Sequence, residues 1–391
     1  MKKSIIFCIS LAVWVSMTGL LQADSFRHTS GESTLLVQAS ENKAQPGVMM
    51  LLLDDPDSGP PPPAGSSPVL DTGLIKCYDN EKEIQCPWPG KPFYGQDAQY
   101  PGRARSYTKL GEHQVPLPDD ELHIDAGGEW IMTKDNTTWL VWEVKTDANK
   151  DEQYDWDDAR DQHISGLNCV QFGGLNNWRL PSKMELSTLV NAGNVSPAID
   201  TQWFPKTEAS RYWSSTTLAD TSAWNVSFQE GYVVFSHVSI EMQARAVSAG
   251  FVVPFDLSDN NDGTVSDPNT ELMWQKCNYG QEWNGSECEG EPVILNWEQA
   301  LSYAEGLNWA GYSDWRLPNI NELQTLVNNS TFGPAVHPPF NSENTESDRY
   351  WSSTTCSHDM SSARHVNFYQ GKGQSSNKTI SIYARAVRNE H

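Results

Sequence analysis

The apolar positions of this chain change their period several times, and each change predicts a short element. Apolar and polar residues alternate over 223–235, AWNVSFQEGYVVF, which indicates strand. The segment RYWSSTT at 211–217 also favours a strand. Helical spacing of apolar residues appears in 297–307, at Trp297, Ala300, Leu301, Ala304 and Leu307.

A further helix is predicted after each of two Leu-Pro pairs. Ser182 and Asn319 follow these pairs and suit the N-cap position, and Glu185 and Glu322 stand three residues later, which is the spacing of a capping box. The apolar face of each helix is supplied by Met184, Leu186 and Leu189 or by Ile320, Leu323 and Leu326.

The same pattern of elements occurs twice in the same order. NNWRLPSKMELSTLVN at 176–191 corresponds to YSDWRLPNINELQTLVN at 312–328, and RYWSSTT recurs unchanged at 349–355. A repeat of about 130 residues indicates tandem globular domains rather than a solenoid. The WRLP phrase is therefore expected twice because one fold is present twice.

The N-terminus predicts export. Lys2 and Lys3 precede a mostly apolar run at 5–21, and Leu-Gln-Ala at 21–23 suits signal-peptidase cleavage. The alternative is a membrane anchor, but the run is short and polar residues interrupt it. We expect a secreted, periplasmic or cell-surface protein with no transmembrane span after cleavage.

Composition divides the chain into five regions. Residues 1–23 are the signal peptide, and residues 24–69 form a linker of low order that ends in a Pro/Ser-rich stretch. Residues 70–122 are a small module with a cysteine pair, too short to build a core alone. The two repeat domains are expected at 123–250 and 251–391.

The cysteines predict disulfide chemistry in an oxidising compartment. Two pairs lie close together in turn-rich sequence, Cys77 with Cys86 and Cys277 with Cys288. A metal site is the competing interpretation, but neither pair has a second cysteine or histidine pair at zinc spacing. Cys169 and Cys356 remain, and two arrangements stay open: a disulfide between the repeats, or free thiols.

The charge excludes some partners. The chain carries 27 Lys+Arg and 50 Asp+Glu, a net charge of -23. Such an acidic protein repels nucleic acid and anionic membranes and is compatible with cations or neutral sugars.

Aromatic residues are numerous, with 16 Trp and 13 Tyr, and they are expected to supply much of the core.

A family resemblance rests on these motifs in combination. A TGLMW-type strand, a W-x-x-A helix, DWRLP-x-x-x-EL, YWSST, V-x-F-x-x-G and a final R-x-V-R occur in order within 124–248 and 255–388. The pattern resembles the family named after the C-terminal domain of the Legionella collagen-like adhesin. The resemblance implies an α+β fold of two tandem C-type-lectin-like domains, each with two helices and small antiparallel sheets.

The same resemblance implies an exported, non-enzymatic binding or adhesion protein for glycans or extracellular matrix. The sulfated glycosaminoglycans associated with the named adhesin suit this chain poorly, because it is acidic and shows no Lys/Arg cluster. The alternative is a structural or assembly component of the cell envelope that binds sister proteins. Ala246 and Ala386 stand where many family members carry a cysteine that pairs with one near the position of Cys169.

Three motifs have both a functional and a structural interpretation. Arg179 and Arg316 of the WRLP phrases are either ligand clamps or partners of Glu185 and Glu322, and we favour the partner role. The sequence DNNDGT at 259–264 lacks the spacing of an EF-hand, so a tight turn is expected instead of a calcium site. The WSST serines have no shared His and Asp, so no catalytic residue and no cofactor is predicted.

Ligand contacts are expected in the divergent loops, since loops on a rigid scaffold commonly carry binding residues. The candidates are polar or aromatic: Trp203, Trp224, Gln229, His337, His358, His365 and Tyr369.

Overall fold

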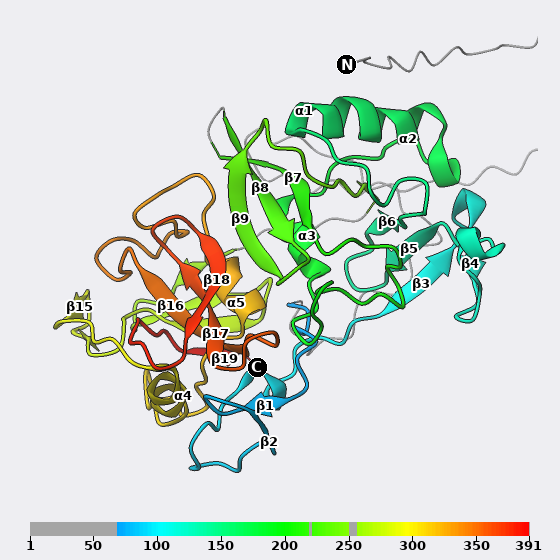
Figure 1. Ribbon diagram of the computed structural model, residues 1–391. Helices are drawn as coiled ribbons and strands as arrows, with labels where there is room; N and C mark the ends of the chain where they lie inside the picture. Colours follow the sequence, from blue (N-terminus) through cyan, green and yellow to red (C-terminus); the bar gives the residue numbers. More distant parts are fainter. Residues whose placement is uncertain (1–68, 219–220, 250–255, 391) are drawn as a thin grey trace, which may run out of the picture. The chain divides into compact units, whose positions relative to one another are not determined.

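The computed structural model describes residues 69–218, 221–249 and 256–390, and both repeats are built mostly from small antiparallel sheets with few helices (Figure 1). This agrees with the expected α+β class. The predicted signal peptide and linker lie outside the described residues. In the part of the chain that is described, no helix is long and apolar enough to cross a membrane.

The first repeat contains a five-stranded sheet, a three-stranded meander and several short helical segments. Its sheet has the order β10-β6-β5-β3-β4, with β3 Tyr107–Leu110, β4 Pro116–Leu117, β5 Met132–Asp135, β6 Val141–Glu143 and β10 Val247–Ser248. Its helices are α1 Trp156–Asp158, a π-helix Ala159–Ile164, α2 Ser165–Cys169 and α3 Lys183–Thr188. The meander is β7 Arg211–Thr217, β8 Ser222–Ser227 and β9 Tyr232–His237.

The second repeat follows the same plan. Its sheet has the order β11-β12-β13-β19, with β11 Ser258–Asp259, β12 Thr264–Asp267, β13 Leu272–Gln275 and β19 Val387–Asn389. Its helices are α4 Trp297–Glu305 and α5 Ile320–Thr325, and its meander is β16 Arg349–Thr355, β17 Ser362–Asn367 and β18 Lys372–Asn377. A hairpin of β14 Glu282–Trp283 and β15 Cys288–Glu289 is added between β13 and α4.

The sequence-predicted helix starts form as expected. Ser182 and Asn319 are N-caps, and both capping boxes are complete. The guanidinium of Arg179 donates to Glu185 Oε1 at 2.6 Å and Oε2 at 2.7 Å. Arg316 makes the same two-pronged contact in the second repeat, at 2.7 Å to each oxygen of Glu322. Each arginine therefore stabilises the first turn of a helix by pairing with its glutamate. This confirms the expected role of the WRLP arginines as partners of Glu185 and Glu322.

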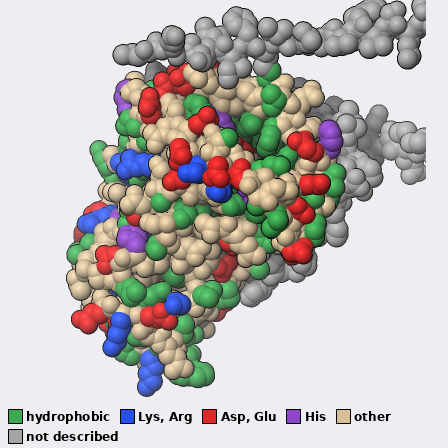
Figure 2. All heavy atoms as spheres, turned by 45° about the vertical axis from the view of Figure 1, so that its right-hand side comes forward, with side chains coloured by type: hydrophobic (Ala, Val, Ile, Leu, Met, Phe, Trp, Pro, Cys, Tyr) green, Lys and Arg blue, Asp and Glu red, His purple; other side chains and the backbone are tan. Residues whose placement is uncertain are grey.

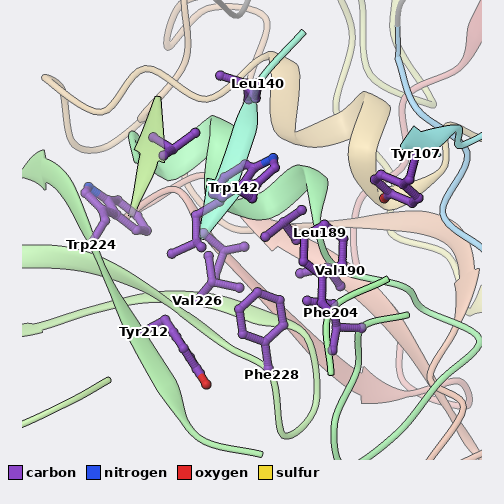
Figure 3. Packing of buried hydrophobic residues seen from close by; sticks show 14 of the residues in the cluster. Tyr107, Leu140, Trp142, Leu189, Val190, Phe204, Tyr212, Trp224, Val226 and Phe228 are labelled. Atoms are coloured by element: carbon purple, nitrogen blue, oxygen red, sulfur yellow. The ribbon is translucent and has the colours of Figure 1, made fainter. Parts of the chain in front are cut away.

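Large aromatic side chains fill the core. In the first repeat Trp142, Tyr212 and Phe228 are fully buried and belong to one hydrophobic cluster (Figure 3). The second repeat uses Trp274, Tyr350, Val366 and Phe368 in the same way. Burying one such side chain contributes about 1.5–3 kcal/mol, so these positions account for much of the stability of each repeat.

The two meanders join into one six-stranded sheet of order β16-β17-β18-β9-β8-β7. The repeats meet where β18 pairs antiparallel with β9, with Gly373 opposite Val233. These two residues hold equivalent positions, because each lies two residues after the glycine of its meander, Gly371 or Gly231. The junction is therefore close to two-fold symmetric, and Figure 1 shows β9 and β18 side by side.

A segment at 69–105 contacts both repeats and is called the bridging module below. It contains β1 Cys77–Tyr78, β2 Glu83–Ile84 and the 3₁₀-helix Asp97–Gln99. Arg105 donates to the carbonyl oxygens of Thr188 at 2.6 Å and Val190 at 2.5 Å in the first repeat. On the second repeat, Asn321 donates to the Leu70 carbonyl at 2.9 Å.

Two strands that fall within the expected module at 70–122 pair with the sheet of the first repeat. Strand β3 pairs with β5, Tyr107 facing Asp135, so it belongs to the sheet of the first repeat rather than to a separate module. Strand β4 extends the same sheet through β3. The sequence signal was weak because these strands are short and lie in turn-rich sequence.

Both local disulfides are confirmed, Cys77–Cys86 and Cys277–Cys288. Cys356 carries a free thiol and is buried. The arrangement in which Cys356 pairs with Cys169 is therefore wrong.

Charges are dispersed over the visible surface. On the face drawn in Figure 2, basic side chains lie in small separate groups between acidic ones.

Candidate functional site

The second repeat has an aromatic cleft of about 590 Å³ beside α4, which we call the α4 cleft. This volume lies within the ~300–1,000 Å³ that is usual for small-molecule sites. Four aromatic side chains line it, together with acids and amides: Tyr279, Trp283, Tyr303, Trp309, Asp262, Glu282, Gln275, Gln281 and Asn308. Aromatic faces with a few polar groups at the edge form the usual composition of a site that binds a ring-shaped polar ligand.

Gly263 sets the positions of the two indoles. A Cβ at this residue would lie 2.9 Å from Trp283 Cγ and 3.1 Å from Trp309 Cζ2, so both rings pack directly against its backbone. Trp309 Nε1 donates to the Gly263 carbonyl at 2.7 Å. The φ of +88° at Gly263 also favours glycine, so the tight turn expected at 259–264 serves as the contact surface between the two rings.

The added hairpin supplies Trp283. Strands β14 and β15 pair Trp283 with Cys288, and the Cys277–Cys288 disulfide ties this pair to the end of β13. Asn278 N donates to Gln281 Oε1 at 3.0 Å and stabilises the turn that precedes the hairpin. These restraints hold an indole that is only partly buried, so the ring is ordered before any ligand arrives.

At the base of the α4 cleft, two tyrosines and a glutamine contact one another. The Tyr279 and Tyr303 rings lie 4.4 Å apart between centroids, and Tyr303 Oη donates to Gln275 Oε1 at 2.7 Å. Burial raises the pKa of Tyr303 above its usual range, which keeps the hydroxyl protonated. Gln275 is itself buried, so its amide has a fixed orientation.

The cleft has no uncompensated positive charge. Lys276 Nζ lies 4.5 Å from the centroid of the Trp283 ring but forms an ion pair with Asp259 Oδ2 at 2.6 Å. Asp262 and Glu282 add carboxylates at the edge. The arrangement suits hydroxyl-rich neutral or cationic ligands and disfavours sulfates and phosphates.

The first repeat fills the equivalent space with buried charges. Glu143 occupies the position of Gln275, and its carboxylate contacts Lys145 Nζ at 3.0 Å and His163 Nε2 at 2.9 Å. Burial alone would raise the pKa of Glu143, but His163 and Lys145 outweigh it and hold the pKa below its usual range. Glu143, Lys145 and His163 therefore form a buried charged network in the first repeat, whereas the equivalent place in the second repeat is part of the α4 cleft.

The π-helix explains how His163 reaches this network. The segment from Trp156 to Gly166 is one residue longer than the segment from Trp297 to Gly306. The structure accommodates the additional residue as the π-helix Ala159–Ile164, which contains His163. The second repeat has the regular helix α4 instead and keeps the cleft.

The candidate residues expected from sequence do not form one site. Trp224 and His365 are buried in β8 and β17 and are not available at the surface. Burial lowers the pKa of His365 to about 4, so this side chain is neutral at physiological pH. Trp203 is half-buried, and its carbonyl accepts from Thr133 Oγ1 at 2.8 Å.

The remaining candidates are at least partly exposed. Gln229 and Tyr369 hold equivalent positions after β8 and β17, and Tyr369 is 54% exposed. His358 is exposed, with Nδ1 3.2 Å from Cys356 Sγ. His337 is half-buried, and burial lowers its pKa.

Sequence reasoning did not select the cleft residues Trp283, Trp309 and Asp262. A usable signal was present, since the segment CNYGQEWNGSEC at 277–288 has no counterpart in the first repeat and carries a tryptophan between its cysteines. Within the described residues, no group of three or more His, Cys, Asp or Glu side chains could hold a metal ion.

The comparison with known families agrees with the duplication. The model of the Lcl C-terminal domain family matches residues 131–248 and again residues 263–388. Curated proteins gave no match to the chain.

Proposed function

Because the chain belongs to the Lcl C-terminal domain family and carries the domain twice, we propose that it is a non-enzymatic binding or adhesion protein that recognises carbohydrate outside the cytoplasm. The adhesin-type domain supports binding in general. The finer assignments, a C-type-lectin-like domain fold and export by a signal peptide, are part of the same proposal. Two local disulfides support an oxidising location.

The observation that carries the proposal is that two indoles, Trp283 and Trp309, pack against Gly263 and line the same cleft. In this proposal the indoles of Trp283 and Trp309, which line the cleft, contact the C–H face of a sugar ring. Asp262, Gln281 and Asn308 lie at the edge, where hydroxyl groups of such a ring need hydrogen-bond partners. The ligand class that fits this combination is a neutral or amino sugar, and an anionic sugar fits poorly.

A glycan array with the full secreted chain is the first experiment, in the presence of calcium and then of a chelator. We expect saturable binding to neutral or amino glycans that persists in chelator, because no carboxylate cluster of the described residues could hold a metal ion. A blank array under both conditions would contradict the proposal and favour protein partners in the cell envelope.

The matched variants are Trp283→Ala and Trp88→Ala. Trp283 lines the α4 cleft, whereas Trp88 is 76% exposed and lies outside it. We expect Trp283→Ala to weaken binding of the best array glycan at least about tenfold, since a buried aromatic contact commonly contributes 2 kcal/mol or more to recognition. Equal affinities of the two variants would place the glycan elsewhere on the protein.

A further inference from the structure

A second pocket lies along one face of α4, and the bridging module lines it from the opposite side. Its volume is about 460 Å³, and residues 89–94 form one wall while Glu298, Ser302 and Glu305 form the other. None of these residues lines the α4 cleft. The two pockets are therefore separate sites that share one helix.

The wall from the bridging module is rigid. Gln96 Nε2 donates to the Phe93 carbonyl at 2.9 Å, and Gln99 Nε2 donates to the Pro87 carbonyl at 2.8 Å. The Phe93 ring packs on Trp297 of α4, 6.3 Å between ring centroids. Phe93 has φ +63°, a conformation that is costly for a bulky side chain and is found where surrounding structure enforces it, often at functional sites.

The wall from α4 carries two carboxylates that form no ion pair among the described residues. Glu298, Ser302 and Glu305 recur at helical spacing and therefore share one face of the helix. Among the described residues, neither Glu298 nor Glu305 forms an ion pair, although Lys91 lines the same pocket.

Glu305 is the more deeply placed of the two acids. Its Oε1 accepts a hydrogen bond from Tyr100 Oη at 2.8 Å, so the side chain is held in position. It is half-buried, and this burial raises its pKa. Arg316 lowers this pKa from a longer distance, but no cation lies within ion-pair distance of the carboxylate among the described residues. A partly desolvated carboxylate of this kind gains from a cation that enters the pocket.

We propose that this pocket binds a basic side chain, lysine or arginine, of a partner polypeptide. The methylene stem would lie on the apolar faces of Pro89, Pro92 and Phe93, and the charged head would reach Glu298 and Glu305. The net charge of -23 attracts basic partners over longer distances and so favours encounter. This pocket is distinct from the α4 cleft, and binding of a basic side chain here does not depend on binding of carbohydrate there.

The test uses the full secreted chain and three acetylated tripeptide amides, Gly-Lys-Gly, Gly-Arg-Gly and Gly-norleucine-Gly, titrated by calorimetry or NMR. We expect the two basic peptides to bind and the norleucine peptide to bind at least about tenfold more weakly. Similar affinity for all three peptides would overturn the proposal, because the carboxylates would then play no part.

Two double variants locate the binding. Glu298→Gln with Glu305→Gln removes the carboxylates of the pocket, and Glu112→Gln with Glu129→Gln removes two exposed carboxylates of the first repeat. We expect the first double variant to weaken binding of the basic peptides at least about tenfold and the second to change it less than about twofold. Equal losses would mean general attraction to an acidic surface and would refute a defined site.

The readouts separate this inference from the carbohydrate proposal. Both double variants should retain the unfolding midpoint and the glycan affinity of the parent chain, because their residues do not line the α4 cleft. Failure of peptide binding with intact glycan binding would overturn the inference alone.

Discussion

Asp97 is a carboxyl group that the fold removes from water at the contact between the bridging module and the second repeat. Its Oδ2 accepts hydrogen bonds from Thr72 Oγ1 at 2.8 Å and from Thr354 Oγ1 at 2.6 Å. Burial raises its pKa to about 7, more than the two hydroxyl groups lower it. The protonated acid is therefore the form that the folded state favours up to neutral pH.

The consequence is a pH-dependent stability that Asp97→Asn should remove. A carboxyl whose pKa is higher in the folded state stabilises the protein at low pH, and this contribution is lost as pH rises from about 4 toward 7. Relative to the variant, the parent chain should lose roughly 2–4 kcal/mol of unfolding free energy across this interval. Urea unfolding at both ends of the interval measures it, with exposed Asp119→Asn as the control.

A parent chain and an Asp97→Asn variant with parallel pH profiles would contradict this account. The comparison with Asp119→Asn is needed because other carboxylates titrate in the same interval. Sequence could not have identified Asp97, since Thr354 is distant along the chain and only the tertiary fold brings its hydroxyl to the carboxyl.

Among the elements, the disulfide hairpin β14–β15 distinguishes the second repeat from the first. The hairpin carries Trp283, and the Cys277–Cys288 bond fixes it to β13. Without that bond the hairpin keeps only a two-residue ladder, which is too short to be stable alone.

Replacing Cys277 and Cys288 by serine should therefore weaken glycan affinity at least about tenfold. Replacing Cys77 and Cys86 by serine is the matched control, because their loop is of similar size but belongs to the bridging module. Either double variant should lose about 2–3 kcal/mol of unfolding free energy, as expected for loops of this length. Loss of glycan binding in both variants, or in neither, would refute the assigned role of the hairpin.

At the same scale, sequence patterns were reliable for elements whose signal is local. The capping boxes at Ser182 and Asn319 and the meander strand 211–217 all formed where spacing placed them. Strand β3 was missed because four residues, Tyr107–Leu110, carry little periodic signal, and its assignment depends on pairing with β5. The π-helix at Ala159–Ile164 was also missed: the repeats differ by one residue in sequence, but only the structure shows that a π-helix accommodates it.

For the molecule as a whole, the junction between repeats is held by more than the sheet. Arg364 on β17 donates to the carbonyls of Gly231 at 2.7 Å and Glu230 at 2.5 Å in the first repeat. Its equivalent in β8, Trp224, packs near Gly371 from the other side. Lys183 is buried beside the Trp224 ring, 4.4 Å from its centroid, and burial lowers its pKa to about 7.

These contacts predict that the two repeats unfold as one cooperative unit. Arg364→Met should cost about 1.5–3 kcal/mol, because two carbonyl groups lose a charged donor, and should separate the calorimetric transition into two. Arg160→Met, which removes an exposed arginine from the first repeat, should leave a single transition. Two transitions in the parent chain would show that the junction does not couple the repeats.

The sequence alone determined the duplication, the family, the helix starts and the local disulfides, because each depends on residues close together or on a repeated pattern. The tertiary structure decided which aromatic residues are core and which form the α4 cleft. Trp224 and Trp283 look alike in sequence, yet the sheet junction buries the first while a disulfide hairpin presents the second. Burial is a property of what packs from distant segments, so composition and spacing could not assign it.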